Sequence, residues 1–375
     1  MPTIRRFDGR FASTPPRRRL SSLLGRPATA VAMAALAGLA TAGLLTATSA
    51  GAASNGQIAI VASDSSAGLS AIVLIPSDRL ATSRDSKTLV SGPGMIGNLQ
   101  WTPDGKTLVY DETVGKRTDL YAIDVASPKR RLLVANLAYG GDGALSPDGT
   151  TVAYWQGSGR SVAVYLVGTD GQSRRKLTAG GYPVWSPDGS RLALLSTAGE
   201  IETIGANGSG VQLVGQLSPT AVIASLAWAP DGESFLVVTQ DYVNSTTVVE
   251  TISSNGTVLH VLFKTGGIPN GWPPAAIWSP GGTQLAFTET FGLNTKAEDH
   301  QNALVANADG SDPHTIDAAT GALQLELSWS PDGRSIVTAD GDRVRVVRAD
   351  GTQAKVIAYP GDEHELDDPA WEPLP

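Results

Sequence analysis

The side chains best suited to acid–base or metal chemistry are the four histidines, which are His260, His300, His314 and His364. A zinc site on a helix would need two of them four residues apart with a glutamate between. Only His364 is followed directly by a glutamate, and no second histidine comes after it. The spacing therefore predicts no metal site, and no motif in the sequence indicates a cofactor.

The usual nucleophile motifs are also missing. The chain has no cysteine, which excludes a disulfide framework, a thiolate metal site, a cysteine nucleophile and lipid attachment to an N-terminal cysteine. It has no Gly-x-Ser-x-Gly turn of the kind that carries a hydrolase serine. Gly105-Lys106-Thr107 would suit a phosphate-binding loop, but that loop requires glycine where Gln100 stands. The acidic loops lack the alternating ligand pattern of a calcium loop. No catalytic residue is predicted.

One five-residue phrase, made of Trp, a small residue, Pro, Asp and Gly, repeats along the chain. Its clearest copy runs from Trp185 to Gly189, and the copies begin at 101, 145, 185, 228, 278 and 329. A broken copy, Trp371-Glu372-Pro373, closes the chain. The spacings are 44, 40, 43, 50, 51 and 42 residues. Self-similarity at about 40–50 residues predicts a propeller or a similar array.

Each phrase has the composition of a tight turn. Proline sets φ for the first central position, aspartate bonds the backbone ahead of it, and glycine supplies a positive φ. Apolar strand-like residues such as Leu192 to Leu195 follow, so each phrase predicts a β-hairpin. Most repeats then carry a second hairpin signal, at Asp170-Gly171, Asn207-Gly208, Asn255-Gly256, Asp309-Gly310 and Asp350-Gly351. Two hairpins make four strands, which is one propeller blade.

The two ends of the repeat region complement each other. Residues 55–62 look like the part of a repeat that follows the turn, and Trp371 supplies the part that precedes it. Pairing these two strands would complete a blade and remove an exposed sheet edge. We therefore expect an all-β propeller of seven blades, whose last blade is closed by the N- and C-terminal strands. Six blades is the alternative, if residues 55–98 do not form three strands.

The repeated phrase resembles the TolB-like, or WD40-like, β-propeller repeats. Arg174-Arg175-Lys176-Leu177-Thr178, just before the clearest copy, matches the usual end of such a repeat. The resemblance covers nearly all of the chain after about residue 55. It implies a propeller fold, and propellers serve as enzymes, binding modules and scaffolds. TolB-type proteins carry an α/β domain before a six-bladed propeller and work in an envelope complex. In this sequence the repeats begin at about residue 55, directly after the N-terminal segment of residues 1–52.

Residues 1–52 have the features of a targeting segment. Seven arginines form a basic front, residues 28–45 are an apolar run of small residues, and Ala50-Gly51-Ala52 fits a cleavage site. Arg17-Arg18-Arg19-Leu20 resembles a twin-arginine signal. We expect residues 53–375 to form a single exported propeller domain without a stable membrane span. The alternative is an uncleaved N-terminal membrane anchor.

Removing the leader makes the protein strongly acidic. The leader holds seven of 28 basic residues and one of 36 acidic residues, so the remainder has 21 basic and 35 acidic residues, a net charge of −14. Such a surface repels phosphate backbones, which argues against a nucleic-acid partner. A monomer that binds a protein or a cell-envelope ligand is expected.

The candidate binding face follows from the order of strands in a blade. The Pro-Asp-Gly and Asp-Gly turns are the first and third connections, so they share one face. The variable second connections and the links between blades crowd the opposite face, where sites usually lie. Ligand-binding candidates on this loop face are its acidic and aromatic residues, Asp111, Glu112, Tyr139, Asp142, Trp155, Tyr182, Asp241, Tyr242, Trp272, Glu289 and Phe291.

Two functions remain open from the sequence. The favoured one is an exported, non-catalytic propeller that binds a protein or cell-envelope ligand through its loop face. The alternative is an extracytoplasmic lyase or glycan-active hydrolase with a site at the mouth of the central channel.

Overall fold

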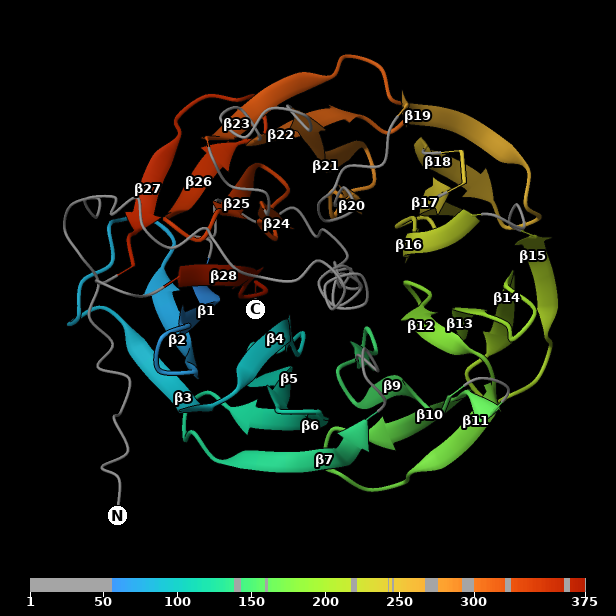
Figure 1. The fold of residues 1–375 in the computed structure, drawn as a ribbon, viewed down its shortest axis with the longest axis horizontal. Coiled ribbons are helices and arrows are strands. Elements are labelled where there is room, and N and C mark those ends of the chain that lie inside the picture. The colour runs from blue at the N-terminus through green and yellow to red at the C-terminus, as the bar shows by residue number, and fades with distance from the viewer. Residues whose placement is uncertain are drawn as a thin grey trace.

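A computed structural model describes residues 56–137, 143–158, 161–216, 221–241, 243–244, 246–266, 276–291, 300–320, 325–360 and 365–374. These residues form seven four-stranded antiparallel sheets arranged in a ring (Figure 1). The all-β, seven-bladed prediction is confirmed, and the six-bladed alternative is excluded. In the part of the chain described here, no helix has the length and apolar character to cross a membrane.

Blades 1 to 4 follow one another along the chain, each running from the innermost strand outward. Blade 1 consists of β4 (Met95–Trp101), β5 (Thr107–Val114), β6 (Arg117–Asp124) and β7 (Arg130–Leu137). Blade 2 consists of β8 (Ala144–Leu145), β9 (Thr151–Gln156), β10 (Ala163–Gly168) and β11 (Arg175–Ala179). Blade 3 consists of β12 (Gly181–Trp185), β13 (Arg191–Leu195), β14 (Glu200–Gly205) and β15 (Gln212–Gln216). Blade 4 consists of β16 (Ala221–Trp228), β17 (Ser234–Asp241), β18 (Thr246–Ser253) and β19 (Val258–Gly266).

The last three blades include the one that joins the chain ends. Blade 5 consists of β20 (Ala276–Trp278), β21 (Gln284–Phe291), β22 (His300–Asn307) and β23 (His314–Thr320). Blade 6 consists of β24 (Glu326–Trp329), β25 (Ser335–Ala339), β26 (Val344–Arg348) and β27 (Lys355–Ala358). Blade 7 consists of β28 (Glu365–Trp371), β1 (Gln57–Asp64), β2 (Leu69–Pro76) and β3 (Lys87–Pro93).

Blade 7 takes its innermost strand from the C-terminal end of the chain and its other strands from the N-terminal end, yet its strands pair in the same register as those of the other blades. Trp371 pairs with Ile58, as Trp101 pairs with Leu108 in blade 1. The missing hairpin turn is replaced by two hydrogen bonds. The Glu372 amide donates to the Gln57 carbonyl at 2.9 Å, and the Gln57 amide donates to Glu372 Oε2 at 2.7 Å. The predicted closure by the N- and C-terminal strands is confirmed.

The repeated phrase forms the same bonded turn in several blades, and blade 3 shows it fully. The Ser186 hydroxyl donates to Asp188 Oδ1 at 2.6 Å, and that carboxylate accepts the amide of Ser190 at 3.0 Å. The Arg191 amide donates to Ser186 Oγ at 2.9 Å. Gly189 closes the turn at φ 69°, in the left-handed region that favours glycine. Serine and aspartate recur because each satisfies backbone donors that the hairpin leaves unpaired.

Four tryptophans of the phrase, in blades 1, 3, 4 and 6, each join their blade to the one before it. In each case the indole Nε1 donates to a backbone carbonyl in the preceding blade. The acceptor is the residue just before the first residue of that blade's own phrase. These bonds are Trp101 to Ala370 at 3.1 Å, Trp185 to Ala144 at 2.9 Å, Trp228 to Val184 at 3.2 Å and Trp329 to Ile277 at 3.4 Å. The tryptophans are therefore packing residues that also hold neighbouring blades in register.

A second belt of bonds runs along the outer edge in the opposite direction. A side chain at the start of an outermost strand donates to a carbonyl in the last hairpin turn of the next blade. The pairs are Lys87 with Val125, Arg131 with Thr169, Arg175 with Ala206, His314 with Ala349 and Lys355 with Asp78. Because of its bond to Ala349, His314 has a structural role at the outer edge, where it joins blade 5 to blade 6.

Deleting residues 369–375 should open the ring. The deletion removes Trp371, whose burial is worth about 3–5 kcal/mol, and exposes the edge of β1. We expect a large fall in melting temperature together with dimers or aggregates, measured by thermal melting and light scattering. Trp228→Ala should cost a similar amount but leave the protein monomeric. A truncated protein as stable and monomeric as the parent would contradict this closure.

The indole bonds can be tested with a matched pair of substitutions. Trp185→Phe removes a bond to Ala144, whereas Trp278 Nε1 is buried without a partner among the described residues. We therefore expect Trp185→Phe to lose about 1 kcal/mol more of unfolding free energy than Trp278→Phe, measured by chemical denaturation. Equal losses would show that the tryptophans act by packing alone.

Candidate functional site

Several innermost strands are irregular at the same position, three residues before the tryptophan of the phrase. We call this the inner-ring position. Asn98, Tyr182 and Asp368 occupy it in blades 1, 3 and 7, with φ values of 57°, 55° and 49°. The strand pairing shifts next to each of them and also next to Ser225, which holds the position in blade 4. Such bulges redirect a side chain and are common near functional sites.

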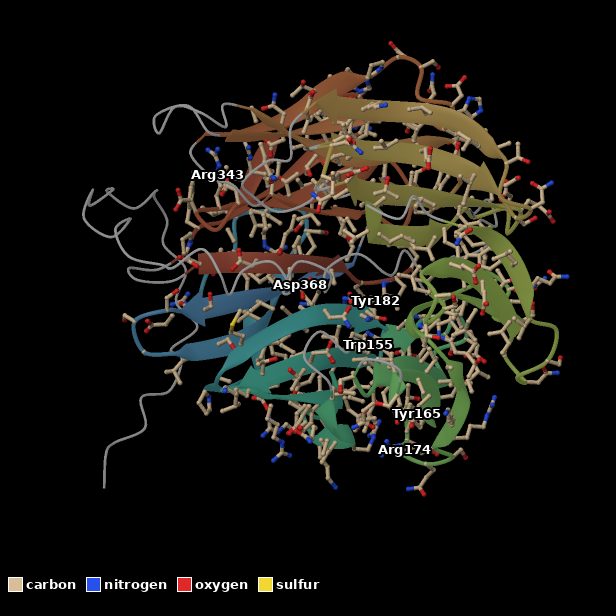
Figure 2. The ribbon with its side chains drawn as sticks, turned by 45° about the vertical axis from the view of Figure 1, so that its right-hand side comes forward. Trp155, Tyr165, Arg174, Tyr182, Arg343 and Asp368 are labelled. Atoms are coloured by element: carbon tan, nitrogen blue, oxygen red, sulfur yellow. The ribbon has the colours of Figure 1, made fainter. Side chains whose placement is uncertain are left out.

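The strain of these bulges differs with the residue. Asparagine and aspartate enter the left-handed region more readily than other residues, because their short side chains can bond locally. Tyrosine has no such advantage, so the conformation of Tyr182 costs free energy that its surroundings must offset. Its ring packs on that of Trp155, with ring centroids 5.1 Å apart. Both residues are labelled in Figure 2. This packing supplies part of the compensation.

Three inner-ring side chains connect neighbouring blades. Glu326, at the inner-ring position of blade 6, accepts a hydrogen bond from the backbone amide of Asp368. The Asp368 Oδ2 atom accepts the amide of Leu99 in blade 1 at 3.0 Å. Asn98 Nδ2 donates to the Gly143 carbonyl beside β8 at 2.8 Å and to Asp111 Oδ2 at 3.0 Å. A polar relay therefore runs around the inner side of the ring from blade 6 to blade 2.

Gln100 makes further hydrogen bonds at the end of this relay, between blades 1 and 2. Its Nε2 atom donates to Asn98 Oδ1 at 2.7 Å and to the Gly143 carbonyl, and its Oε1 atom accepts the amide of Leu145 at 2.7 Å. Gln100 and Asn98 are both buried. A buried polar network is rigid when its members are satisfied. The relay thus fixes the backbone between blades 1 and 2.

An electronegative region surrounds β28. Burial, followed by the negative charges of Glu326 and Glu365, raises the pKa of Asp367 to about 8. Burial also raises the pKa of Asp340, against the opposing effect of Arg343, whose Nε lies 3.1 Å from Asp340 Oδ2. Asp367 keeps partial exposure to solvent on its strand. This region can bind or release a proton near neutral pH.

The predicted residues Asp111 and Glu112 lie in β5 rather than in a loop. Asp111 belongs to the relay. Glu112 pairs with Arg130, whose Nη1 lies 3.0 Å from Glu112 Oε2 and whose guanidinium stacks 4.7 Å from the ring centroid of Tyr121. Both carboxylates are buried. They stabilise the blade from within, and neither lies exposed on the rim as the loop prediction implied.

Trp155 and Tyr182 are also in strands, β9 and β12. Trp155 is only 9% exposed and belongs to the core shared by blades 2 and 3. Tyr182 is half-buried beside it. The two rings therefore pack together in the core between blades 2 and 3, and Tyr182 is the one of the two that is partly exposed to solvent.

Asp241 and Glu289 lie at strand ends on the loop side. Asp241 caps the turn after β17, accepting the amides of Val243 at 3.0 Å and Asn244 at 2.9 Å. Burial raises the pKa of Glu289 in β21. Phe291 ends β21, and its side chain lies outside the described part. Tyr139, Asp142, Tyr242 and Trp272 lie outside the described residues altogether.

The loop face also carries exposed apolar side chains. Met95 at the start of β4 is 73% exposed, Val114 at the end of β5 is 48% exposed, and Val243 in the turn after β17 is 74% exposed. All three lie at second connections or at blade-to-blade links. Exposed apolar groups beside polar ones are typical of interaction surfaces.

The chemistry available at this face is recognition by hydrogen bonds, negative charge and apolar contact. Within the described ranges, no group of three or more histidine, aspartate or glutamate side chains could hold a metal ion. The described histidine side chains, His260 and His314, belong to the outermost strands β19 and β23. Neither lies on the innermost strands, so neither is an acid–base partner for the inner-ring carboxylates.

The sequence prediction missed most of the inner ring. Asn98, Gln100, Glu326, Asp340, Asp367 and Asp368 were not among its candidates. Counting three residues back from each tryptophan would have found Asn98, Glu326 and Asp368 together with the candidate Tyr182. The remaining three carry no such signal, because tertiary contacts bring them together.

Comparison with known proteins places this geometry in context. Residues 59–274, more than half of the chain, match the family model described as TolB beta propeller domain. Among solved structures, TolB from Acinetobacter baumannii is similar, with a TM-score of 0.55 and 19% identity over 85% of this chain and 67% of that chain. No curated protein sequence matches the chain.

Enzymes are also among the proteins with similar structures. An oligogalacturonate lyase in complex with manganese has a TM-score of 0.53 and 14% identity, covering 78% of this chain and 84% of its own. The hydrazine synthase of Kuenenia stuttgartiensis has a TM-score of 0.52 and 16% identity, covering 67% of this chain and 76% of its own. At these identities the similarity shows the fold alone, since one fold serves many functions.

Substitution of Asn98 tests the relay. Asn98→Ala removes the bonds to Asp111 and Gly143 and forces alanine into the left-handed region, so we expect a loss of about 2–4 kcal/mol. Asn98→Gly loses the same bonds without that backbone cost and should be about 1 kcal/mol less destabilising. Denaturant melts of both variants measure the difference. If the alanine variant were the more stable, the left-handed backbone would not be a constraint.

Proposed function

Because the chain belongs to the TolB beta propeller domain family, we propose that it is an exported, non-catalytic propeller that binds a protein or cell-envelope ligand through its loop face. The single observation that supports this most is the contrast between the two faces. The opposite face is built from tight, internally bonded turns. The loop face carries redirected polar side chains and the exposed Met95, Val114 and Val243.

A protein is the ligand that this mixture suits best. Apolar side chains contribute area to an interface, and the exposed or partly exposed carboxylates of β28 supply orientation. The rigid blades hold the surface in place before binding, which lowers the ordering cost of association. The strong negative charge of residues 53–375 would favour a partner with a positive contact surface.

Export is part of the same proposal. The basic, apolar and small-residue parts of residues 1–52 have the order of a secretory signal, with a cleavage pattern at Ala50-Gly51-Ala52. The first strand begins at Gln57, so cleavage after Ala52 would leave the propeller complete. A membrane anchor retained at the N-terminus is the alternative localisation. We propose that the exported propeller is a monomer, since ring closure pairs the terminal strands within one chain.

An extracytoplasmic lyase or glycan-active hydrolase is the second candidate. The observation in its favour is the raised pKa of Asp367, because a carboxyl group that titrates near neutral pH can transfer protons. The similar lyase structure was solved with manganese. An assay with oligogalacturonate and added Mn²⁺ tests this candidate directly. Turnover that Asp367→Asn abolishes would favour the enzyme over the binding module.

N-terminal sequencing of exported protein tests the leader. We expect a mature chain that begins at Ala53, because the small residues at 50 and 52 fit the signal peptidase pattern. Protein that stays in the membrane fraction with its first residues intact would support the anchored alternative.

The binding face can be tested with one pair of valine substitutions. Val243→Asp puts a charge on the loop face, and Val211→Asp puts the same charge on the opposite side, where Val211 is 56% exposed. Residues 53–375 would be used to capture a partner from envelope extract, and the affinity of each variant for that partner then measured. We expect Val243→Asp to weaken binding at least tenfold, with Val211→Asp unchanged and both melting temperatures near the parent value. The reverse result would assign binding to the tight-turn face.

A further inference from the structure

The strand that closes the ring is also the strand where the carboxyl groups gather. β28 pairs with β1 inside blade 7 and packs against β24 and β25 of blade 6 and β4 of blade 1. Asp368 bonds to both neighbours, through its amide to Glu326 and through its Oδ2 atom to the Leu99 amide. A second contact comes from the Leu366 amide, which donates to the Gly341 carbonyl at 3.0 Å. Two of the hydrogen bonds that join β28 to its neighbouring blades therefore have a carboxylate as acceptor, that of Glu326 or of Asp368.

The charges facing Asp367 come from several elements. β28 itself contributes Glu365 and Asp368, β24 contributes Glu326, and the turn after β25 contributes Asp340. Asp342 and Arg343 follow in that turn, and Arg343 is paired with Asp340. β4 carries no charged residue, and β1 carries only Asp64 at its far end. Among the described residues of these elements and of the turn after β25, one cation, Arg343, stands against seven carboxyl groups, counting Asp367 itself.

We propose that Asp367, together with Glu326 and Asp368, forms a proton-operated latch, which holds β28 in the ring while one proton is bound and loosens it when all three are ionised. The step is a simple acid dissociation, in which the carboxyl proton passes to water or buffer. It extends beyond ligand binding, because it concerns how firmly the last strand is held.

The direction of the effect follows from the pKa of Asp367. Burial and the neighbouring carboxylates raise this pKa from the ordinary 3.8 to about 8 in the folded protein. When β28 detaches, Asp367 returns to water and ionises, so opening releases a proton between about pH 4 and pH 8. The strand should then be held most firmly at low pH and less firmly as the pH rises to about 8. Above this pKa, no further loosening is expected.

Hydrogen exchange measured on residues 53–375 tests the latch. Protection factors correct for the faster chemistry of exchange at high pH, so they report opening alone. For amides of β28, we expect protection to fall by up to about tenfold per pH unit between pH 6 and pH 8 and to level off by pH 9. Amides of β13 in blade 3 should keep constant protection, since they lie far from the cluster in the ring (Figure 1). Equal behaviour of the two strands would overturn the proposal.

Variants separate the latch from general effects of charge. Asp367→Asn imitates the protonated form, so its β28 protection should not change between pH 6 and pH 9. Glu326→Gln keeps an acceptor for the Asp368 amide but removes a charge, so its fall in protection should end at a lower pH. Asp312→Asn, an exposed aspartate in a left-handed turn, should behave as the parent. If Asp367→Asn does not fold, the Glu326→Gln profile decides, and an unshifted profile would refute the latch.

Discussion

The pairing of β28 with β1 is the interaction on which the whole ring depends. Every other blade is made from consecutive strands, so its hydrogen bonds form between neighbours in the sequence. Blade 7 instead joins strands more than three hundred residues apart, so this pairing closes a far longer loop than any other pairing and costs more loop entropy. The ring closes in register because Trp371 and Ile58 occupy the places of a tryptophan and its partner in an ordinary repeat. Closure also covers the edge of β1, which would be exposed without β28.

Two belts of bonds then hold the blades at fixed positions. The indole bonds of four blades point to the preceding blade near the centre, and the outer bonds of five blades point to the following blade at the periphery. Bonds at two radii resist rotation of one blade against another better than bonds at one radius. Each bond contributes only about 1 kcal/mol, so the belts act mainly by fixing geometry, while the buried apolar clusters between blades supply most of the stability.

The fold could be predicted from the sequence because its determinants are local and repeated. The turn phrase recurs often enough that the blade length, the strand number and the closure by Trp371 all follow from counting. The candidate site could be predicted only in part. Tyr182 and Asp111 were among the sequence candidates, but the sequence placed Asp111 in a loop, whereas it lies in β5 and accepts a hydrogen bond from Asn98. Asp367 and Glu326 are 41 residues apart, and only ring closure gives Asp367 its raised pKa.

Some positions of the repeat hold the same residue in most blades, and other positions hold residues that differ from blade to blade. Serine, aspartate, glycine and tryptophan of the phrase are repeated because each has a structural task that is the same in every blade. The inner-ring position has no such common task, and it holds asparagine, tyrosine, serine, glutamate and aspartate in the described blades. The side chains of Asn98, Glu326 and Asp368 bond to a neighbouring blade, whereas the ring of Tyr182 packs on Trp155 and is partly exposed to solvent. The strain accepted at Tyr182 fits this view, because a residue chosen for packing alone would avoid the left-handed region. A change at Tyr182 would therefore alter a surface that meets solvent without removing the bonds between blades that Asn98, Glu326 and Asp368 make.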